Sequence, residues 1–98
     1  MDPNINRAGV IRDKLQQRFA PLELAVRDDS AQHAGHAGAR DGRGHFAVRV
    51  VSKDFADHNR VERHRMVYGA LGELMQTDIH ALRITALTPE ETDQPNAP

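Results

Sequence analysis

The hydrophobic period changes repeatedly along this chain, and the order of those changes restricts it to few folds. Two segments place apolar residues at helical spacing, and three alternate apolar and polar residues with the period of two that is typical of strands with one buried face. The helical segments are 6–19 (NRAGVIRDKLQQRF) and 60–76 (RVERHRMVYGALGELMQ). The strand segments are 22–29 (LELAVRDD), 45–52 (HFAVRVVS) and 80–87 (HALRITAL).

The order helix, strand, strand, helix, strand predicts an α+β fold with a three-stranded mixed sheet packed on helices. Each strand has one apolar face, and two amphipathic helices suffice to cover the sheet in a two-layer sandwich. We expect the first two strands to form a hairpin. The helical crossover between the second and third strands favours a parallel pair there.

The helical period of 60–76 predicts which of its side chains are buried. Its apolar face contains one histidine, His64, which we interpret as a core histidine that faces the sheet rather than as a ligand. The same argument on 80–87 places His80 on one face with Leu82 and Ile84. The predicted buried face of the helix comprises Val61, His64, Val67, Tyr68, Leu71, Leu74 and Met75.

Length and composition predict one domain. The chain has 98 residues, of which 39% are hydrophobic, enough for a single modest core. We assign residues 1–87 to that domain and expect 88–98, acidic and without apolar residues to bury, to be disordered. No stretch approaches the ~18 apolar residues of a membrane helix, so we expect no membrane association. The chain has no cysteine, which excludes disulfides and sites built only from its own thiolates.

Histidines are concentrated in the connection between the first two strands. The hairpin loop runs from about Asp29 to Gly44, far longer than the ~2–5 residues usual for hairpins. It contains His33 and His36, whose ordinary interpretation is as solvated loop residues and whose alternative interpretation is as metal ligands. His45 opens the second strand and points away from its apolar face, so we interpret it as structural.

The chain resembles the BolA-like family over about residues 8 to 91. The resemblance is carried by HFAVRVVSKDF, RVERHRMVYGAL and DIHALRITALTPEE, and above all by RHR followed by VY and then IHAL. It implies a fold related to the type II KH domain, in agreement with the order of periods. The chain departs from the family after Phe55, where a short turn that usually contains glycine instead reads Ala-Asp-His-Asn.

The resemblance also implies a role in iron-sulfur chemistry. Family members bind a [2Fe-2S] cluster jointly with a monothiol glutaredoxin, whose cysteine and bound glutathione supply two sulfur ligands to the heterodimer. The family's ligands correspond here to His33 in the loop and His80 in the IHAL strand, with His36 as a substitute. Cluster assembly, cluster trafficking, or iron and redox sensing are the expected roles. The expected location is the cytoplasm for a bacterial protein and the mitochondrion or plastid for a eukaryotic one.

Two alternative functions remain open, and a third is not expected. Some bacterial members regulate transcription in the stress response and in cell morphology, and DNA binding here would use four basic residues near the second helix: Lys53, Arg60, Arg63 and Arg65. A simple zinc site formed by His33, His36 and His80 is a rival to the cluster. We expect no enzymatic activity, because the sequence lacks a Gly-x-Ser-x-Gly elbow, a paired-carboxylate motif and a phosphate-binding loop.

Overall fold

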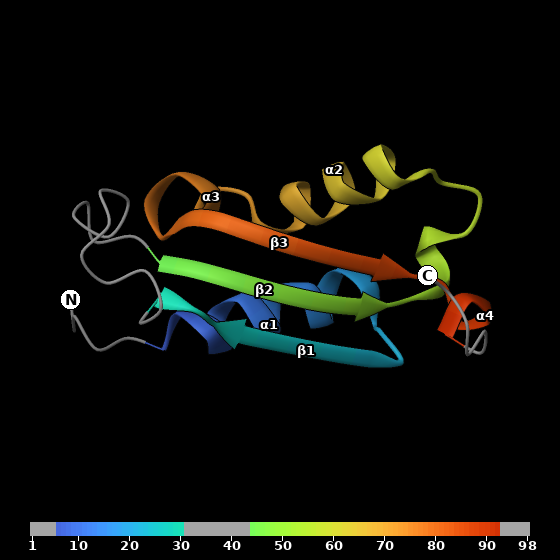
Figure 1. Cartoon of the computed structure of the whole chain (residues 1–98), viewed down its shortest axis with the longest axis horizontal. Helices are drawn as coiled ribbons and strands as arrows, with labels where there is room; N and C mark the ends of the chain where they lie inside the picture. The colour runs from blue at the N-terminus through green and yellow to red at the C-terminus, as the bar shows by residue number, and fades with distance from the viewer. Residues whose placement is uncertain (1–5, 31–43, 93–98) are drawn as a thin grey trace.

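The computed structural model describes residues 6–30 and 44–92 (Figure 1). None of the described helices is long and apolar enough to cross a membrane. The predicted His33 and His36 lie outside the described residues. The elements are, in order, α1 (Arg7–Phe19), β1 (Glu23–Asp28), β2 (Gly44–Val51), the 3-10 turn η3 (Lys53–Phe55), α2 (Arg60–Leu71), α3 (Leu74–Thr77), β3 (Ile79–Leu87) and α4 (Pro89–Thr92).

The three strands form one sheet in the order β1-β2-β3. β1 and β2 are antiparallel, with Val26 opposite Val48, and β2 and β3 are parallel, with Val48 opposite Ile84. The predicted α+β class, the hairpin and the parallel pair are therefore confirmed. α2 lies in the crossover between β2 and β3, as a parallel connection requires.

Both long helices cover the same face of the sheet. Side chains from α1 and α2 join the inward side chains of the strands in a single buried cluster, and Figure 1 shows α1 behind the strands. No described helix packs on the opposite face of the sheet, whose strand residues such as Ala25, Arg49 and Thr85 are exposed. The buried cluster comprises Ile11, Leu15, Phe19, Phe46, Val48, Val50, Phe55, Val67, Leu71, Ile79 and Ile84.

α1 begins and ends as its sequence predicts. The Asn6 side chain accepts a hydrogen bond from the Gly9 N–H at 2.9 Å, which satisfies one of the unpaired donors of the first turn. The helix ends at Phe19. From its outer side, Arg12 donates a hydrogen bond to the Leu24 carbonyl at 3.3 Å, on the edge strand β1.

The predicted helix 60–76 is interrupted. α2 ends at Leu71 because Gly72 has a φ of +56°, which a residue with a side chain rarely adopts, and the short α3 follows. The predicted buried face is also wrong in part: Val61 is 58% exposed and Tyr68 41%, while His64 is half-buried rather than part of the core. Because α2 is short, only two of its side chains, Val67 and Leu71, are fully buried in the core.

The turn before α2 uses two residues for separate tasks. Asp57 takes the left-handed conformation, with a φ of 66°. Asn59 forms a capping box with Glu62, in which each side chain accepts a hydrogen bond from the other residue's N–H. The short turn therefore keeps the geometry that begins a helix although it contains no glycine.

The assignment of all of 88–98 to a disordered tail is wrong for residues 88–92. Thr88 is buried, and α4 follows it as one ordered turn. Glu91 accepts a hydrogen bond from the Thr88 N–H at 2.7 Å and pairs with Arg63 of α2 at 2.6 Å. Arg63 also donates to the carbonyls of Ala86 and His58, so it joins α2, β3 and α4.

We call the region where β2 and β3 finish, with Ser52, Arg63, Thr88 and Glu91, the anchored end.

Candidate metal-binding site at one end of the sheet

His80 lies at a β-bulge. Gly44 pairs with Ile79 whereas His45 pairs with Ala81, so His80 is an extra residue in β3. The bulge places Ile79 in the core at 1% exposure and leaves His80 exposed. The prediction that His80 shares the face of Leu82 and Ile84 is therefore wrong, because a single inserted residue changes which side chains face inward.

A second histidine lies beside it. The ring centroids of His45 and His80 are 5.1 Å apart, with the ring planes inclined by 51°. His45 is held by its backbone: its N–H donates to Ser30 Oγ at 3.1 Å, and its carbonyl accepts from the Asp29 N–H at 2.7 Å. We call this region, residues 44–45 and 78–81, the histidine end.

The backbone of the histidine end is fixed by close packing. The Gly44 N–H donates to the Asp78 carbonyl at 2.9 Å, which joins the start of β2 to the start of β3. A Cβ on Gly44 would lie 2.6 Å from Phe46 Cε2 and 2.7 Å from Ser30 Oγ, so only glycine fits there. The Asp78 side chain pairs with Arg7 of α1 at 3.1 Å. A hydrogen bond from the Thr77 hydroxyl, with a further contribution from Arg7, lowers the pKa of Asp78.

The two histidines suit a metal ion that needs further ligands from elsewhere. Two imidazoles that share one ion with bonds of about 2.1 Å have ring centroids roughly 5 Å apart, close to the observed separation. Imidazole is a good ligand for iron and zinc. Within 6–30 and 44–92, no third imidazole or carboxylate completes a set of three around them. Whether His33 or His36 contributes stays a prediction, because both lie outside those ranges.

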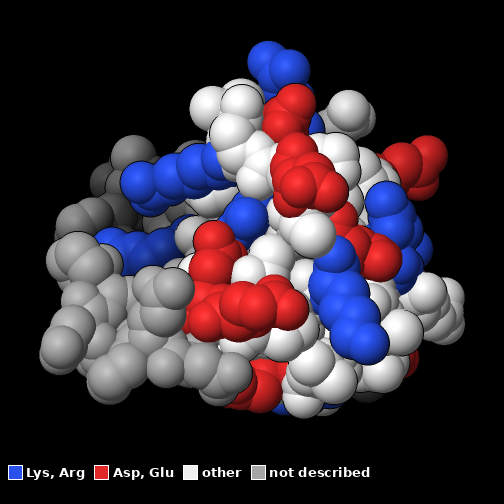
Figure 2. Space-filling view, turned by 90° about the vertical axis from the view of Figure 1, so that its right-hand side faces the viewer, with Lys and Arg blue, Asp and Glu red and all other residues white. Residues whose placement is uncertain are grey.

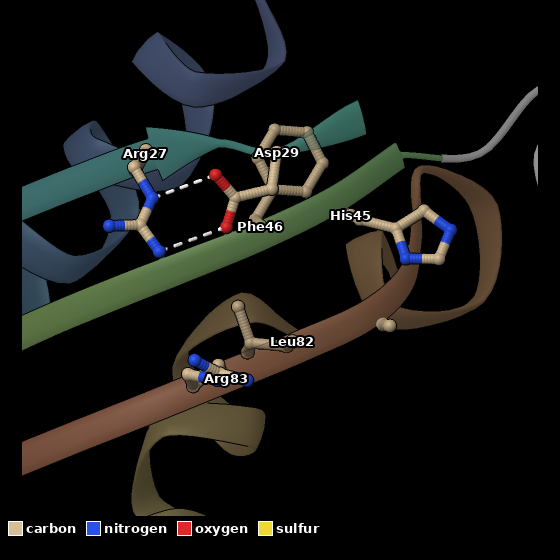
Figure 3. A pocket seen from close by; sticks show the side chains of 7 residues that line it. Arg27, Asp29, His45, Phe46, Leu82 and Arg83 are labelled. Carbon is tan, nitrogen blue, oxygen red and sulfur yellow. Dashed lines mark hydrogen bonds and ion pairs between the residues drawn. The ribbon is translucent and has the colours of Figure 1, made fainter. Parts of the chain in front are cut away.

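A groove extends from His45 along the sheet (Figure 3). Its volume is about 350 Å³, and its lining includes Arg27, Asp29 and Arg83 besides His45. Figure 3 shows the Asp29 carboxylate facing the Arg27 guanidinium, with Nε–Oδ1 and Nη2–Oδ2 distances of 2.7 and 3.1 Å. The sequence analysis did not single out Arg27, Asp29 or Arg83 and interpreted His45 as structural; the strand register brings Arg27, His45 and Arg83 to the same groove.

The residues predicted for DNA binding do not form one basic patch. Lys53, Arg60 and Arg65 are exposed, but Arg63 points inward, at 14% side-chain exposure, and pairs with Glu91. Arg63 is therefore bonded within the anchored end rather than exposed beside the other three basic residues. Figure 2 shows acidic and basic side chains interleaved over this end of the molecule. Exposed acids in residues 53–65 are Asp54, Asp57 and Glu62.

The chain is similar in sequence to proteins from plants and bacteria. It is 49% identical over 90 residues to "Protein BOLA1, chloroplastic" of Arabidopsis thaliana, matching 89% of this chain and 56% of that protein. It is 37% identical over 82 residues to the "DNA-binding transcriptional regulator BolA" of Haemophilus influenzae, matching 84% of this chain and 77% of that protein. The chain thus spans about half the length of the Arabidopsis relative.

The fold is also similar to that of a solved BolA domain. The solved BolA domain of SufE1 from Arabidopsis thaliana superposes with a TM-score of 0.79 at 44% identity, covering 88% of this chain and 95% of that one. The family model described as "BolA-like protein" matches residues 15–91, which contain β1, β2, α2, β3 and both histidines of the pair. Sequence, sheet topology and family model agree, and the chain belongs to the BolA-like protein family.

Proposed function

We propose that this protein binds a [2Fe-2S] cluster jointly with a monothiol glutaredoxin and is an accessory protein, not an enzyme. The observation that carries the proposal is the pair of imidazoles at 5.1 Å, at an end of the sheet that leaves His80 exposed. In Rieske-type clusters two histidines bind one iron and cysteines bind the other. The chain has no cysteine, so a partner and its glutathione supply the thiolates.

His80 is the ligand that both the resemblance and the geometry support. For the second ligand, the resemblance favours His33, with His36 as a substitute, and the ring distance favours His45. The bulge supports His80 in this role, because an extra residue can turn its side chain outward without removing a core side chain. A bound cluster supplies iron and sulfide for transfer or a redox signal, and the protein's own residues hold it at the surface.

The test is anaerobic reconstitution of the full chain with a monothiol glutaredoxin, glutathione, iron and sulfide. We expect a heterodimer with visible absorption, which His80→Ala abolishes or shifts. Separate His33→Ala, His36→Ala and His45→Ala variants identify the second ligand. His58→Ala is the matched control, because His58 is a similarly accessible histidine in the turn before α2. An unchanged spectrum in His80→Ala would contradict the assignment, and bound zinc without visible absorption would favour the zinc site.

DNA binding is the second candidate, supported by the name of the Haemophilus relative and by exposed Lys53, Arg60 and Arg65. Three phosphate contacts predict a slope of roughly −3 for log affinity against log salt concentration. Residues 53–65 hold four basic and three acidic side chains, so their net charge gives this candidate little support. Binding that does not respond to salt, measured by fluorescence anisotropy on a duplex, would exclude it.

A further inference from the structure

The face of the sheet opposite the helices has a composition of its own. From the row of Ala25, Arg49 and Thr85 to the histidine end, its outward side chains are small or basic, and none is phenylalanine, tyrosine, tryptophan or a large aliphatic side chain. They alternate along each strand with the buried residues of the core. The outward residues of this part of the face are Ala25 and Arg27 of β1, His45, Ala47 and Arg49 of β2, and Ala81, Arg83 and Thr85 of β3.

The strand register places two of these arginines on either side of an alanine. Arg27 lies opposite Ala47, and Ala47 lies opposite Arg83, in one row across the three strands. Neighbouring strands are about 4.8 Å apart, so the two arginine backbones flank a floor roughly 10 Å wide. A second groove of about 430 Å³ lies over this row and shares Arg27 and Arg83 with the groove at His45.

Arg27 and Arg83 could both bind an anion, but only Arg27 is held in place by an ion pair with a described residue. Asp29, at 15% side-chain exposure, holds Nε and Nη2 of Arg27, whose side chain remains 66% exposed. A guanidinium fixed in this way loses little conformational freedom when its remaining N–H groups bind a carboxylate. Arg83 is exposed and has no ion pair with any residue in 6–30 or 44–92.

The net charge of the row is positive. Among the described residues, Asp29 balances Arg27, and Glu23, at 3.6 Å, partly balances Arg49 of the adjacent row, so Arg83 carries the unbalanced charge. The groove at His45 is lined by Arg27 and Arg83 as well. A molecule that reaches the histidines across this face must therefore cover Arg83 with something that balances its charge.

We propose that the open face of the sheet docks an acidic surface of the partner protein, with a carboxylate of that partner between Arg27 and Arg83 over Ala47. This inference rests on the proposed function, since the partner is the glutaredoxin that supplies the thiolates. The alanine floor lets a partner backbone approach closely. Nucleic acid fits less well, because the outward side chains of the described strands include no phenylalanine, tyrosine or tryptophan on which a base could stack.

The test measures the affinity of the glutathione-loaded, cluster-free glutaredoxin by calorimetry. Arg83→Glu is expected to weaken binding about tenfold or more, because it opposes the partner's acid with a like charge. The matched control is Arg65→Glu, an identical charge change on the exposed side of α2, which should alter affinity less than about twofold. Circular dichroism checks that both variants are folded.

A second variant tests the position between the arginines. Ala47→Glu places a carboxylate of the chain itself in the row, where it competes with the partner for Arg27 and Arg83, so binding should weaken comparably. Equal losses in Arg83→Glu and Arg65→Glu, or no loss in either, would overturn the docking face while leaving a coloured wild-type complex intact. Loss of duplex-DNA binding instead of glutaredoxin binding would assign the face to nucleic acid. A wild-type chain that forms no complex contradicts the proposed function as well.

Discussion

The two ends of the sheet use their polar groups differently. At the anchored end, Arg63 bridges α2, β3 and α4, and the buried Ser52 hydroxyl donates to the Phe19 carbonyl at 3.0 Å. At the histidine end, hydrogen bonds fix the backbone, while the exposed His80 side chain faces outward beside His45. One end uses its side chains to hold the fold, and the other fixes its backbone by hydrogen bonds and leaves the His80 side chain exposed.

This difference shows how a small domain separates the side chains that hold its fold from those that it leaves exposed. A buried cation must be paired, which makes the side chains of the anchored end interdependent. An exposed imidazole on a bulge contributes little to packing, so replacing it should have little effect on the stability of the core. Replacing exposed side chains at the histidine end should therefore spare stability, whereas replacing side chains of the anchored end, or adding one to the packed backbone at Gly44, should reduce it. Three predictions test this separation.

The largest effect is expected from Gly44→Ala at the histidine end. The new Cβ would lie 2.6 Å from Cε2 of Phe46, so this buried ring, at 3% exposure, must shift, and overpacking of this kind costs about 2–3 kcal/mol. Chemical denaturation measures this loss of unfolding free energy. The control is Gly69→Ala, where no atom lies within 4 Å, which should stabilise the helix by up to about 1 kcal/mol. A neutral Gly44→Ala would mean that the backbone here is not fixed.

A smaller loss of stability is expected from Arg63→Ala. The change removes hydrogen bonds to Ala86, His58 and Glu91 and should lower the free energy of unfolding by about 2 kcal/mol. Arg65→Ala, at an exposed site of the same helix, should stay within about 0.5 kcal/mol of the wild type. The reconstituted cluster should keep its visible spectrum in folded Arg63→Ala. Loss of that spectrum would show that the two ends are coupled.

The smallest effect is a change in acid sensitivity. Hydrogen bonds from Arg63 and then from the Thr88 N–H hold the pKa of Glu91 below its ordinary value of 4.5. A lowered carboxyl pKa adds stability that is complete above 4.5 and is lost as the pH falls through the lower folded-state pKa. Glu91→Gln should therefore flatten the decline of the melting temperature below pH 4.5. If the melting temperature of Glu91→Gln fell with pH as steeply as that of the wild type, Glu91 would not contribute to the stability of the anchored end.

The sequence predicted the fold well because hydrophobic period is a local property. The order of elements and the parallel pair follow from runs of eight to seventeen residues that need no tertiary information. α4 was missed because its order depends on Glu91 meeting Arg63, 28 residues away. Gly72 was visible in the sequence, but helical spacing continues past it and hides the break.

The candidate site was predicted only in part, since it depends on register. His80 was named from the IHAL motif, yet its outward position follows from a one-residue bulge. A signal for that bulge was present: Ile79 and Leu82 are both apolar at an odd spacing, which a regular strand would place on opposite faces. No local pattern could pair His45 with His80, because their contact crosses from β2 to β3.

The arginines of the two long helices also bear on the solubility of the chain. The outer strands of an open sheet expose main-chain groups to which another polypeptide can add as a new strand. Here Arg12 occupies the Leu24 carbonyl on β1, and Arg63 occupies that of Ala86 on β3. An incoming strand must first displace a guanidinium on either side, which opposes edge-to-edge aggregation while leaving the broad face of the sheet accessible.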